Sequence, residues 1–289
     1  MILVTGATGN VGSEAVRLLA ERGLPVRALV RDGRQAKVTA LAEAGAEIAV
    51  GDMEVPASVD AALADVTTVV LVSPGMPAQE LNVIKSAART EVGHVVKASS
   101  NASADSPIAR RRWAAEIEAG LAASGLPHTL LRSNGYMQNT LALAPAIAKT
   151  SSFGSAAGAG KMGMVDARDV AAMAAEVAVS TSGGAGKAGH AGKTYWLTGP
   201  ELITYFDVAA VLSKLLGRAV TYRELSFEEN KKAMVEAGVP EPVAQMNAQA
   251  FSMIADGDGA WLSDDIPAVL GRPARSYEQF AEDYKAVFS

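Results

Sequence analysis

Short apolar runs alternate with stretches of helical periodicity through the first half of this 289-residue chain. The apolar runs predict strands at residues 2–4, 25–30, 46–50, 67–72, 94–98 and 128–131. The helical stretches between them begin at residue 13 and continue at 34–44, 56–64, 79–90 and 109–123. Strands separated by helices of this length form right-handed βαβ units. We therefore expect an α/β fold built on a Rossmann-type, doubly wound parallel sheet.

The alternation weakens after Arg132. The pattern there predicts a helix at residues 137–148, a Gly/Ala/Ser-rich loop at 151–163, a helix at 166–180 capped by Asp166, and a flexible linker at 183–192. A strand at 193–198 is expected to return to the sheet, and the remainder is helical apart from a strand at 219–223. The sequence thus predicts a nucleotide-binding Rossmann domain at residues 1–150 and a small, mostly helical substrate-binding lobe at 151–289.

Composition and charge narrow the class of ligand. Hydrophobic residues make up 49% of the chain and charged residues 20%, with a formal net charge of −5. The longest basic run is at residues 110–112, so we expect no nucleic-acid partner. The chain opens on a strand, leaving no room for a signal peptide, and no apolar run approaches membrane-spanning length. We expect a cytoplasmic protein that binds a small molecule.

The residue types for several kinds of catalysis are missing. Cysteine is absent, which excludes disulfides and thiolate chemistry and suits a reducing cytosol. His94, His128 and His190 lie far apart in the sequence, so no metal site is expected. No tyrosine is followed by lysine four residues later, the pair with which many hydride-transferring enzymes of this fold lower a phenol pKa.

Three glycines lie between the first strand and the first helix. Gly6 allows a tight turn, Gly9 lets the backbone approach a pyrophosphate, and Gly12 lets the helix pack closely on the strand. Backbone N–H groups of residues 9–12 and the helix dipole then attract phosphate charge. The alternative is an ordinary glycine-rich loop. The flanking strand and helix favour a dinucleotide site that comprises Gly6, Thr8, Gly9, Asn10, Val11 and Gly12.

Arg31 provides a second dinucleotide signal, just past the second strand. An acidic residue in this region binds a ribose 2′-hydroxyl, whereas an arginine favours a 2′-phosphate, to which Arg34 and Lys37 can add charge. The neighbouring Asp32 keeps NAD(H) open, and a solvated cationic face is the simpler alternative. We favour NADP(H).

Polar residues close the third to sixth strands. Asp52 follows the third strand and either accepts from the adenine amino group or forms a turn. Ligands of open α/β sheets bind outside the carboxyl ends of the strands, so the later segments are expected at the nicotinamide. Ser73, with Pro74 and Gly75, and Ser99 are the expected cofactor contacts there. The side chains expected to orient a substrate carbonyl are Tyr136, Asn134, Ser99 and Ser100.

Methionine and aromatic side chains accumulate in the irregular and C-terminal segments. They can wall an adaptable apolar pocket, although for any one of them a place in the ordinary core is the more common role. The side chains in question are Met76, Met137, Met162, Met164, Met246, Met253, Phe153 and Trp261.

Several stretches together resemble the NmrA-like branch of the atypical short-chain dehydrogenase/reductases, which includes quinone, triphenylmethane-dye and azo-type reductases. The resemblance rests on residues 6–12 (GATGNVG), 30–32, 51–52, 124–132 (SGLPHTLLR), 135–139 (GYMQN), 165–171 (VDARDVA), 195–200, 270–273 and 277–280. It implies NADP(H), with the 2′-phosphate on Arg31 and the pyrophosphate on the turn at 6–12. The family often lacks the Tyr/Lys pair. Where relatives often carry histidine before Glu116 and Glu118, this chain has Ala114.

Three functions are consistent with these features. An NADPH-dependent reductase of quinones or related planar aromatics suits the missing Tyr/Lys pair, because reduction of a quinone needs little acid catalysis. A non-catalytic NADP(H) sensor is the second, since some family members sense redox state. The third is a tailoring enzyme of aromatic polyketides, such as an anthrone or phenol oxygenase on the same fold.

Overall fold

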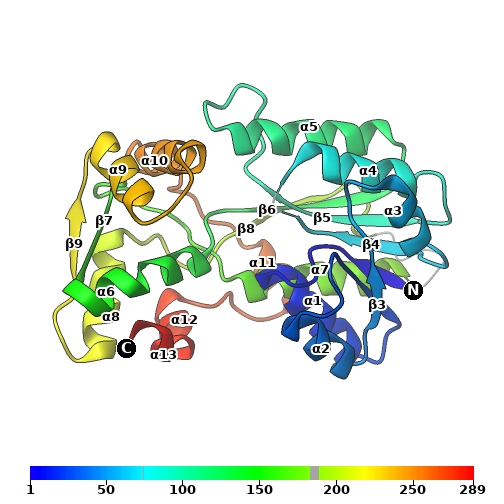
Figure 1. Ribbon diagram of the computed structural model, residues 1–289, viewed down its shortest axis with the longest axis horizontal. Helices are drawn as coiled ribbons and strands as arrows, with labels where there is room; N and C mark the ends of the chain where they lie inside the picture. The colour runs from blue at the N-terminus through cyan, green and yellow to red at the C-terminus, as the bar shows by residue number, and fades with distance from the viewer. Residues whose placement is uncertain (74, 183–188) are drawn as a thin grey trace.

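A parallel seven-stranded sheet forms the larger body of the molecule within the residues that the structure, a computed structural model, describes: 1–73, 75–182 and 189–289 (Figure 1). Its strand order is β3-β2-β1-β4-β5-β6-β8, and this order confirms the predicted Rossmann-type fold. The strands are β1 (Ile2–Val4), β2 (Val26–Val30), β3 (Glu47–Val50), β4 (Thr68–Leu71), β5 (His94–Ser100), β6 (His128–Ser133) and β8 (Thr194–Leu197). Pro74 and positions 183–188 of the expected linker lie outside the described residues.

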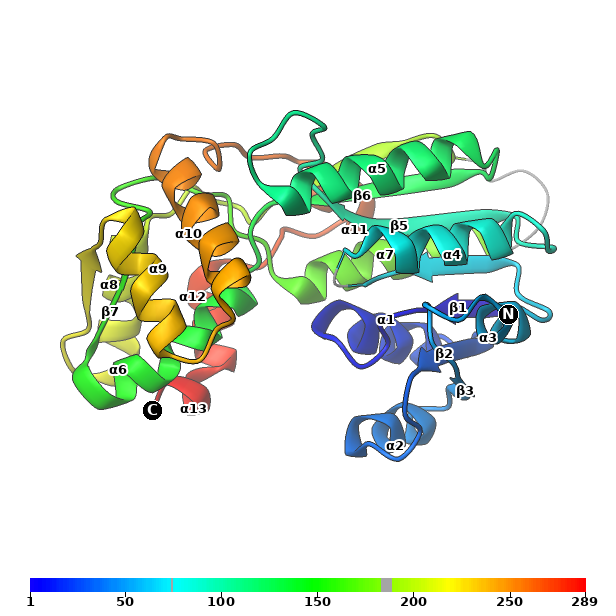
Figure 2. The ribbon, with the colours of Figure 1, turned by 45° about the horizontal axis from the view of Figure 1, so that its top comes forward.

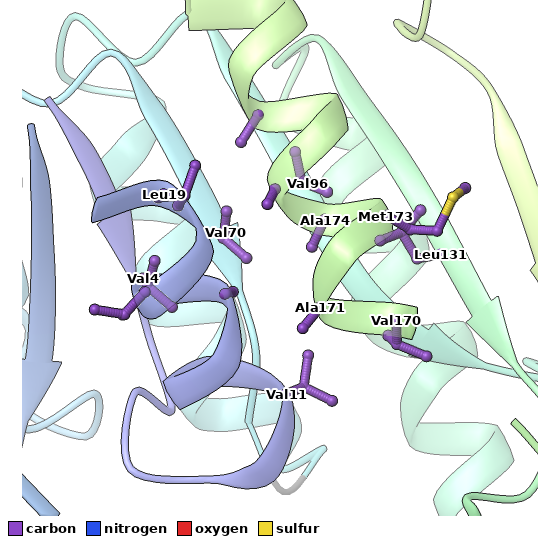
Figure 3. Packing of buried hydrophobic residues seen from close by; sticks show 14 of the residues in the cluster. Val4, Val11, Leu19, Val70, Val96, Leu131, Val170, Ala171, Met173 and Ala174 are labelled. Carbon is purple, nitrogen blue, oxygen red and sulfur yellow. The ribbon is translucent and has the colours of Figure 1, made fainter. Parts of the chain in front are cut away.

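Two helical layers cover the sheet (Figure 2). One face carries α1 (Asn10–Glu21), α2 (Ala36–Glu43) and α7 (Ala167–Ser182), and the other carries α3 (Pro56–Ala62), α4 (Pro77–Ala87) and α5 (Ala109–Ala123). Successive strand residues point to opposite faces, so Val4 packs under α1 and α7 while Leu3 packs under α3 and α4. Figure 3 shows Val4, Val70 and Val96 in the first of these cores, where the small residues of α7 let it approach α1 closely.

A smaller lobe follows β6 and lies beyond the carboxyl ends of the strands (Figure 1). Its elements are the 3₁₀ helix η1 (Met137–Leu143), α6 (Ala144–Thr150), β7 (Ser152–Ser155), α8 (Tyr205–Leu216), β9 (Thr221–Glu224), α9 (Phe227–Glu236), α10 (Glu241–Ala255), α12 (Tyr277–Asp283) and α13 (Lys285–Phe288). Its core gathers aromatic rings, among them Phe153, Tyr205, Tyr222 and Phe280.

The structure differs from the expected elements in three places. The segment at 151–163, expected as a loop, contains β7, which pairs in parallel with β9. The helix expected at 137–148 divides into η1 and α6. Besides β8, which lies beside β6, the sheet body also takes α7 and α11 (Asp265–Leu270) from beyond residue 150. The assignment of nucleotide binding to one body and substrate binding to the other stays a prediction.

Candidate functional site

A cavity of about 420 Å³ opens at the carboxyl ends of β1 to β4. We call it the nucleotide cleft, because most of the residues predicted to hold a dinucleotide line it. These are Gly6, Thr8, Gly9, Asn10, Val11, Arg31, Asp52 and Ser73. Tyr136 also lines the cleft, whereas Gly12, Ser99, Ser100 and Asn134 do not.

The glycine turn forms one end of the cleft. Gly6 has a φ of +56°, and a Cβ there would lie 2.6 Å from the carbonyl oxygen of Val72. A Cβ on Gly12 would lie 2.2 Å from the oxygen of Gly6, so this position packs the helix onto the turn rather than facing the cleft. Gly9 precedes α1 and provides no side-chain cap, which leaves the N–H groups of the first helical turn open to an anion.

Arg31 is exposed at the wall of the cleft, and among the described residues its guanidinium has no hydrogen-bond or ion-pair partner. The two neighbouring cations are engaged: Arg34 pairs with Asp32 at 3.2 Å, and the Lys37 Nζ donates to the Thr8 carbonyl at 3.3 Å. Hydrogen bonds from the backbone and guanidinium of Arg34 lower the pKa of the Asp32 carboxyl. Asp32 is thus hydrogen-bonded to Arg34. Of these three cations, Arg31 is the one without a hydrogen-bond partner among the described residues.

Asp52 forms the turn that was one of its two expected roles, and its contact with adenine stays a prediction. Its Oδ1 accepts the backbone N–H of Glu54 at 2.9 Å, which is a turn-forming contact, and the residue also lines the cleft. The Ser73 hydroxyl, in contrast, donates to the buried Glu80 carboxylate and accepts the N–H of Gly75 at 2.8 Å. Ser73 therefore lines the cleft, but its hydroxyl proton is already donated to Glu80.

Three of the side chains expected to face a substrate are placed elsewhere. Ser99 is buried and donates to Glu118 at 2.6 Å, and the same carboxylate accepts from Arg132. The Asn134 amide donates to the Gly259 carbonyl at 3.0 Å and accepts from the Gly135 N–H at 2.8 Å. Both side chains serve local structure here, and Ser100 lies outside the cleft lining. Their roles at a substrate stay predictions.

Tyr136 lies where the cleft meets the smaller lobe. Its hydroxyl is 3.4 Å from Ser133 Oγ, and burial raises its pKa. The hydroxyl donates its one proton to Ser133 across this long distance, so a closer acceptor in the cleft can take that hydrogen bond in its place.

Sequence reasoning missed further lining residues, including Gln79, Gln138, Asn139 and Ala167. The Gln138 amide donates to Asp166 at 2.8 Å and accepts the N–H of Ala167 at 2.9 Å, so the wall is rigidly built. Gln138, Asn139 and Ala167 lie in the stretches 135–139 and 165–171 that resemble the family, and that resemblance is the signal in the sequence that could have identified them. Met137, Met162, Met164 and Phe153 belong to the core of the lobe, their simpler role.

The histidines, distant in sequence, gather at the opposite edge of the sheet. His94 begins β5 and His128 begins β6, and the backbone of His190 accepts from Thr129, the residue after His128, at 2.7 Å. No group of three His, Asp or Glu among the described residues is placed to hold a metal ion. Across the same residues, no helix is long and apolar enough to cross a bilayer.

Comparisons with known proteins agree with this geometry. Residues 1–268 match the model of the NmrA-like family. NAD(P)H azoreductase of Xenophilus azovorans is 37% identical over 292 residues, which cover 100% of this chain and 99% of that protein. The Escherichia coli NADPH-dependent quinone oxidoreductase, solved with NADPH, has a TM-score of 0.85 and 32% identity over 100% of both chains.

A third relative is the triphenylmethane reductase of Citrobacter sp., solved with NADP(H). Its TM-score is 0.84 and its identity 29%, over 98% of this chain and 99% of that one. The chain is therefore an oxidoreductase that belongs to the NmrA-like family.

Proposed function

We propose that this oxidoreductase uses NADPH to reduce quinones or related planar aromatic compounds. The observation that supports the cofactor is the Arg31 guanidinium, which has no partner within the described part of the chain, at a cleft whose end is the start of α1 without a side-chain cap. The names of the relatives support the substrate class, since they are a quinone reductase, an azoreductase and a triphenylmethane reductase.

The residues present fit NADP(H). The first turn of α1 would hold the pyrophosphate, because its N–H groups lack a side-chain cap and Gly6 and Gly9 keep the backbone accessible. Arg31 would hold the 2′-phosphate by charge-assisted hydrogen bonds. Asp52 would meet the adenine with the carboxylate oxygen that its turn leaves unused.

The bound dihydronicotinamide supplies a hydride for the reduction. This chain orients the substrate: Tyr136 keeps its phenolic proton because of its raised pKa and can hydrogen-bond to a substrate carbonyl as negative charge develops there. A quinone yields a comparatively stable oxyanion, so a hydrogen-bond donor suffices where other members of the fold use a tyrosine activated by lysine. The missing Tyr/Lys pair and Ala114 are consistent with this requirement.

The decisive experiment mixes the purified chain with NADPH and a panel of quinones, azo dyes and anthrones, in air and without oxygen. We expect loss of reduced-nicotinamide absorbance that depends on the quinone or dye in both atmospheres. Binding of NADPH without turnover of any acceptor would instead indicate a redox sensor. Conversion of an anthrone by oxygen alone would indicate a polyketide-tailoring oxygenase.

Arg31→Ala tests the cofactor assignment. We expect NADPH affinity to fall by about 10- to 100-fold, which corresponds to the loss of one or two charge-assisted hydrogen bonds, while NADH affinity changes little. Arg34→Ala is the comparison in the same loop: its guanidinium already forms an exposed pair with Asp32, so its loss should weaken NADPH binding less than the loss of Arg31 does. Equal losses for NADPH and NADH, measured by calorimetry, would contradict the 2′-phosphate assignment.

A further inference from the structure

A second cavity, of about 390 Å³, lies between α1, α7 and α11 and shares no lining residue with the nucleotide cleft. We call it the arginine cavity. Two acidic residues line it, Glu14 and Glu176. The five arginines that line it are Arg17, Arg22, Arg168, Arg272 and Arg275. Nothing in the proposed reaction uses this cavity.

Asp169, at the start of α7, binds two of the arginines that line the arginine cavity. This fully buried carboxylate accepts from Arg272 at 2.7 Å, from the backbone N–H of Arg275 at 2.7 Å, and from the Arg275 guanidinium. Two guanidinium groups therefore share a single carboxylate, which leaves one positive charge in excess at this place. Both arginines stay about a third exposed, with side-chain exposures of 39% and 31%.

In the part of the chain that the structure describes, the five arginines form ion pairs with six carboxylates, two of which line the cavity. The excess positive charge is therefore confined to the place where Arg272 and Arg275 share Asp169. Arg17 is engaged by Glu14 and Glu21, and Arg168 by Asp166 and Asp283. These two arginines have little left to offer a ligand.

The donors left for a ligand belong to Arg22, Arg272 and Arg275. Among the described residues the guanidiniums of Arg22 and Arg275 each have one nitrogen bonded to a carboxylate, and their remaining N–H groups have no partner. Arg272 bonds Asp169 and the Pro273 carbonyl through its two terminal nitrogens, and among the same residues its Nε–H has no partner. The Arg22 partner, Glu176, is held in a pair that is exposed at both ends, at 41% and 36%. Exposed pairs of this kind contribute little free energy, so an incoming anion can take the place of Glu176.

We infer that the arginine cavity binds a phosphate group. A tetrahedral oxyanion carries several acceptors that the N–H groups of Arg272 and Arg275, which meet on Asp169, can bond, while Arg22 adds positive charge on the wall of the same cavity. The cavity volume lies within the range of small-molecule sites and exceeds what a phosphate alone fills, so a phosphate monoester of a small organic group also fits.

The test titrates inorganic phosphate and, separately, glycerol 3-phosphate into the full-length chain carrying Arg31→Ala, which removes the 2′-phosphate contact proposed in the nucleotide cleft. The first turn of α1 stays intact in this variant, so the substitutions below are needed to locate the binding. Calorimetry should give saturable one-to-one binding of at least one probe, with a dissociation constant on the order of 1 mM or below that weakens as salt is added. Tighter binding of glycerol 3-phosphate identifies a monoester site, and equal binding identifies a free-phosphate site.

Two further substitutions in that background locate the binding. Arg275→Ala should weaken it by at least tenfold. Because Arg275 also holds buried Asp169, Arg22→Ala serves as the second variant, since its exposed pair contributes little to folding. Lys214→Ala, at an exposed pair in the lobe, is the control that leaves binding unchanged. The inference is overturned if neither probe binds up to about 10 mM, or if binding ignores both arginine substitutions.

Discussion

Tyr136 is the residue that we propose orients a substrate. Of the four side chains expected to orient a carbonyl, Tyr136 lines the cleft and the other three do not, and its hydroxyl has one long contact, 3.4 Å to Ser133 Oγ. Tyr136→Phe should lower kcat/KM for a quinone about tenfold, the value of one hydrogen bond made in the transition state. Tyr195→Phe is the matched control, because that hydroxyl bonds His190 at the far edge of the sheet. An unchanged kcat/KM in Tyr136→Phe would remove this role.

Residues with backbone roles were easier to predict from sequence than residues with side-chain roles. Gly12 is required by its contact with Gly6, six positions earlier, and Gly6 by its own positive φ, so their spacing indicates the turn although the contact of Gly6 with Val72 is distant in sequence. Ser99 was predicted to follow the fifth strand but lies within the end of β5, and its hydroxyl bonds Glu118 on a helix 19 positions later. Local sequence does not reveal that partner, and the same holds for Asn134 and Gly259.

At the scale of elements, the starts of β5 and β6 make the fold sensitive to acid. His94 is buried, and its Nε2 bonds Thr129 Oγ1 at 2.9 Å; that hydroxyl in turn donates to the His190 carbonyl, so His94 is the neutral donor. Burial, helped by His128 and His190, lowers the pKa of His94 to about 4. Between this value and the unfolded pKa of about 6.5, the unfolded chain binds the extra proton. This contribution is therefore complete above pH 6.5 and decreases as pH falls toward 4.

Urea unfolding at pH 7 and pH 4.5 measures this dependence. We expect the wild-type chain to lose about 2–3 kcal/mol more of its unfolding free energy between these pH values than His94→Gln, which has no titrating group at this position. His128→Gln is the comparison: that ring is partly exposed and is a smaller cause of the lowered His94 pKa than burial, so this variant should keep most of the wild-type loss. Equal losses in the wild type and His94→Gln would show that His94 does not couple folding to pH.

Elements were predictable where local periodicity decides them. The helix expected at 109–123 matches α5 residue for residue, and β4 was evident from its β-branched run. β7 has one large apolar side chain, Phe153, and exists because its backbone pairs with β9 some seventy positions away. Pairings over such distances leave almost no periodicity in the strand itself.

At the scale of the whole molecule, residues 257–263 fasten the lobe to the sheet body. Asp258 pairs with Arg111 of α5, and Gly259 accepts from the Asn134 amide at 3.0 Å and from the Gly163 N–H at 3.2 Å. Trp261 packs edge-on against Trp196 of β8, at 5.4 Å between ring centres. None of these residues lines the nucleotide cleft. We therefore expect these contacts to affect the position of the lobe relative to the sheet body and not the shape of the cleft.

Asp258→Asn tests the fastening, because it removes the ion pair and leaves Arg111 largely buried without its charge partner. We expect amide exchange at Gly163 to rise about tenfold, which corresponds to roughly 1.4 kcal/mol of local stability, while exchange at Val96 in the sheet core stays unchanged. NADPH affinity should also stay unchanged, and KM for a quinone should rise as the lobe loosens. Asp60→Asn, which breaks the exposed pair with Arg89, is the control and should alter neither readout. Unchanged exchange at Gly163 in Asp258→Asn would mean that Asn134 and the tryptophan pair hold the lobe without help from the ion pair.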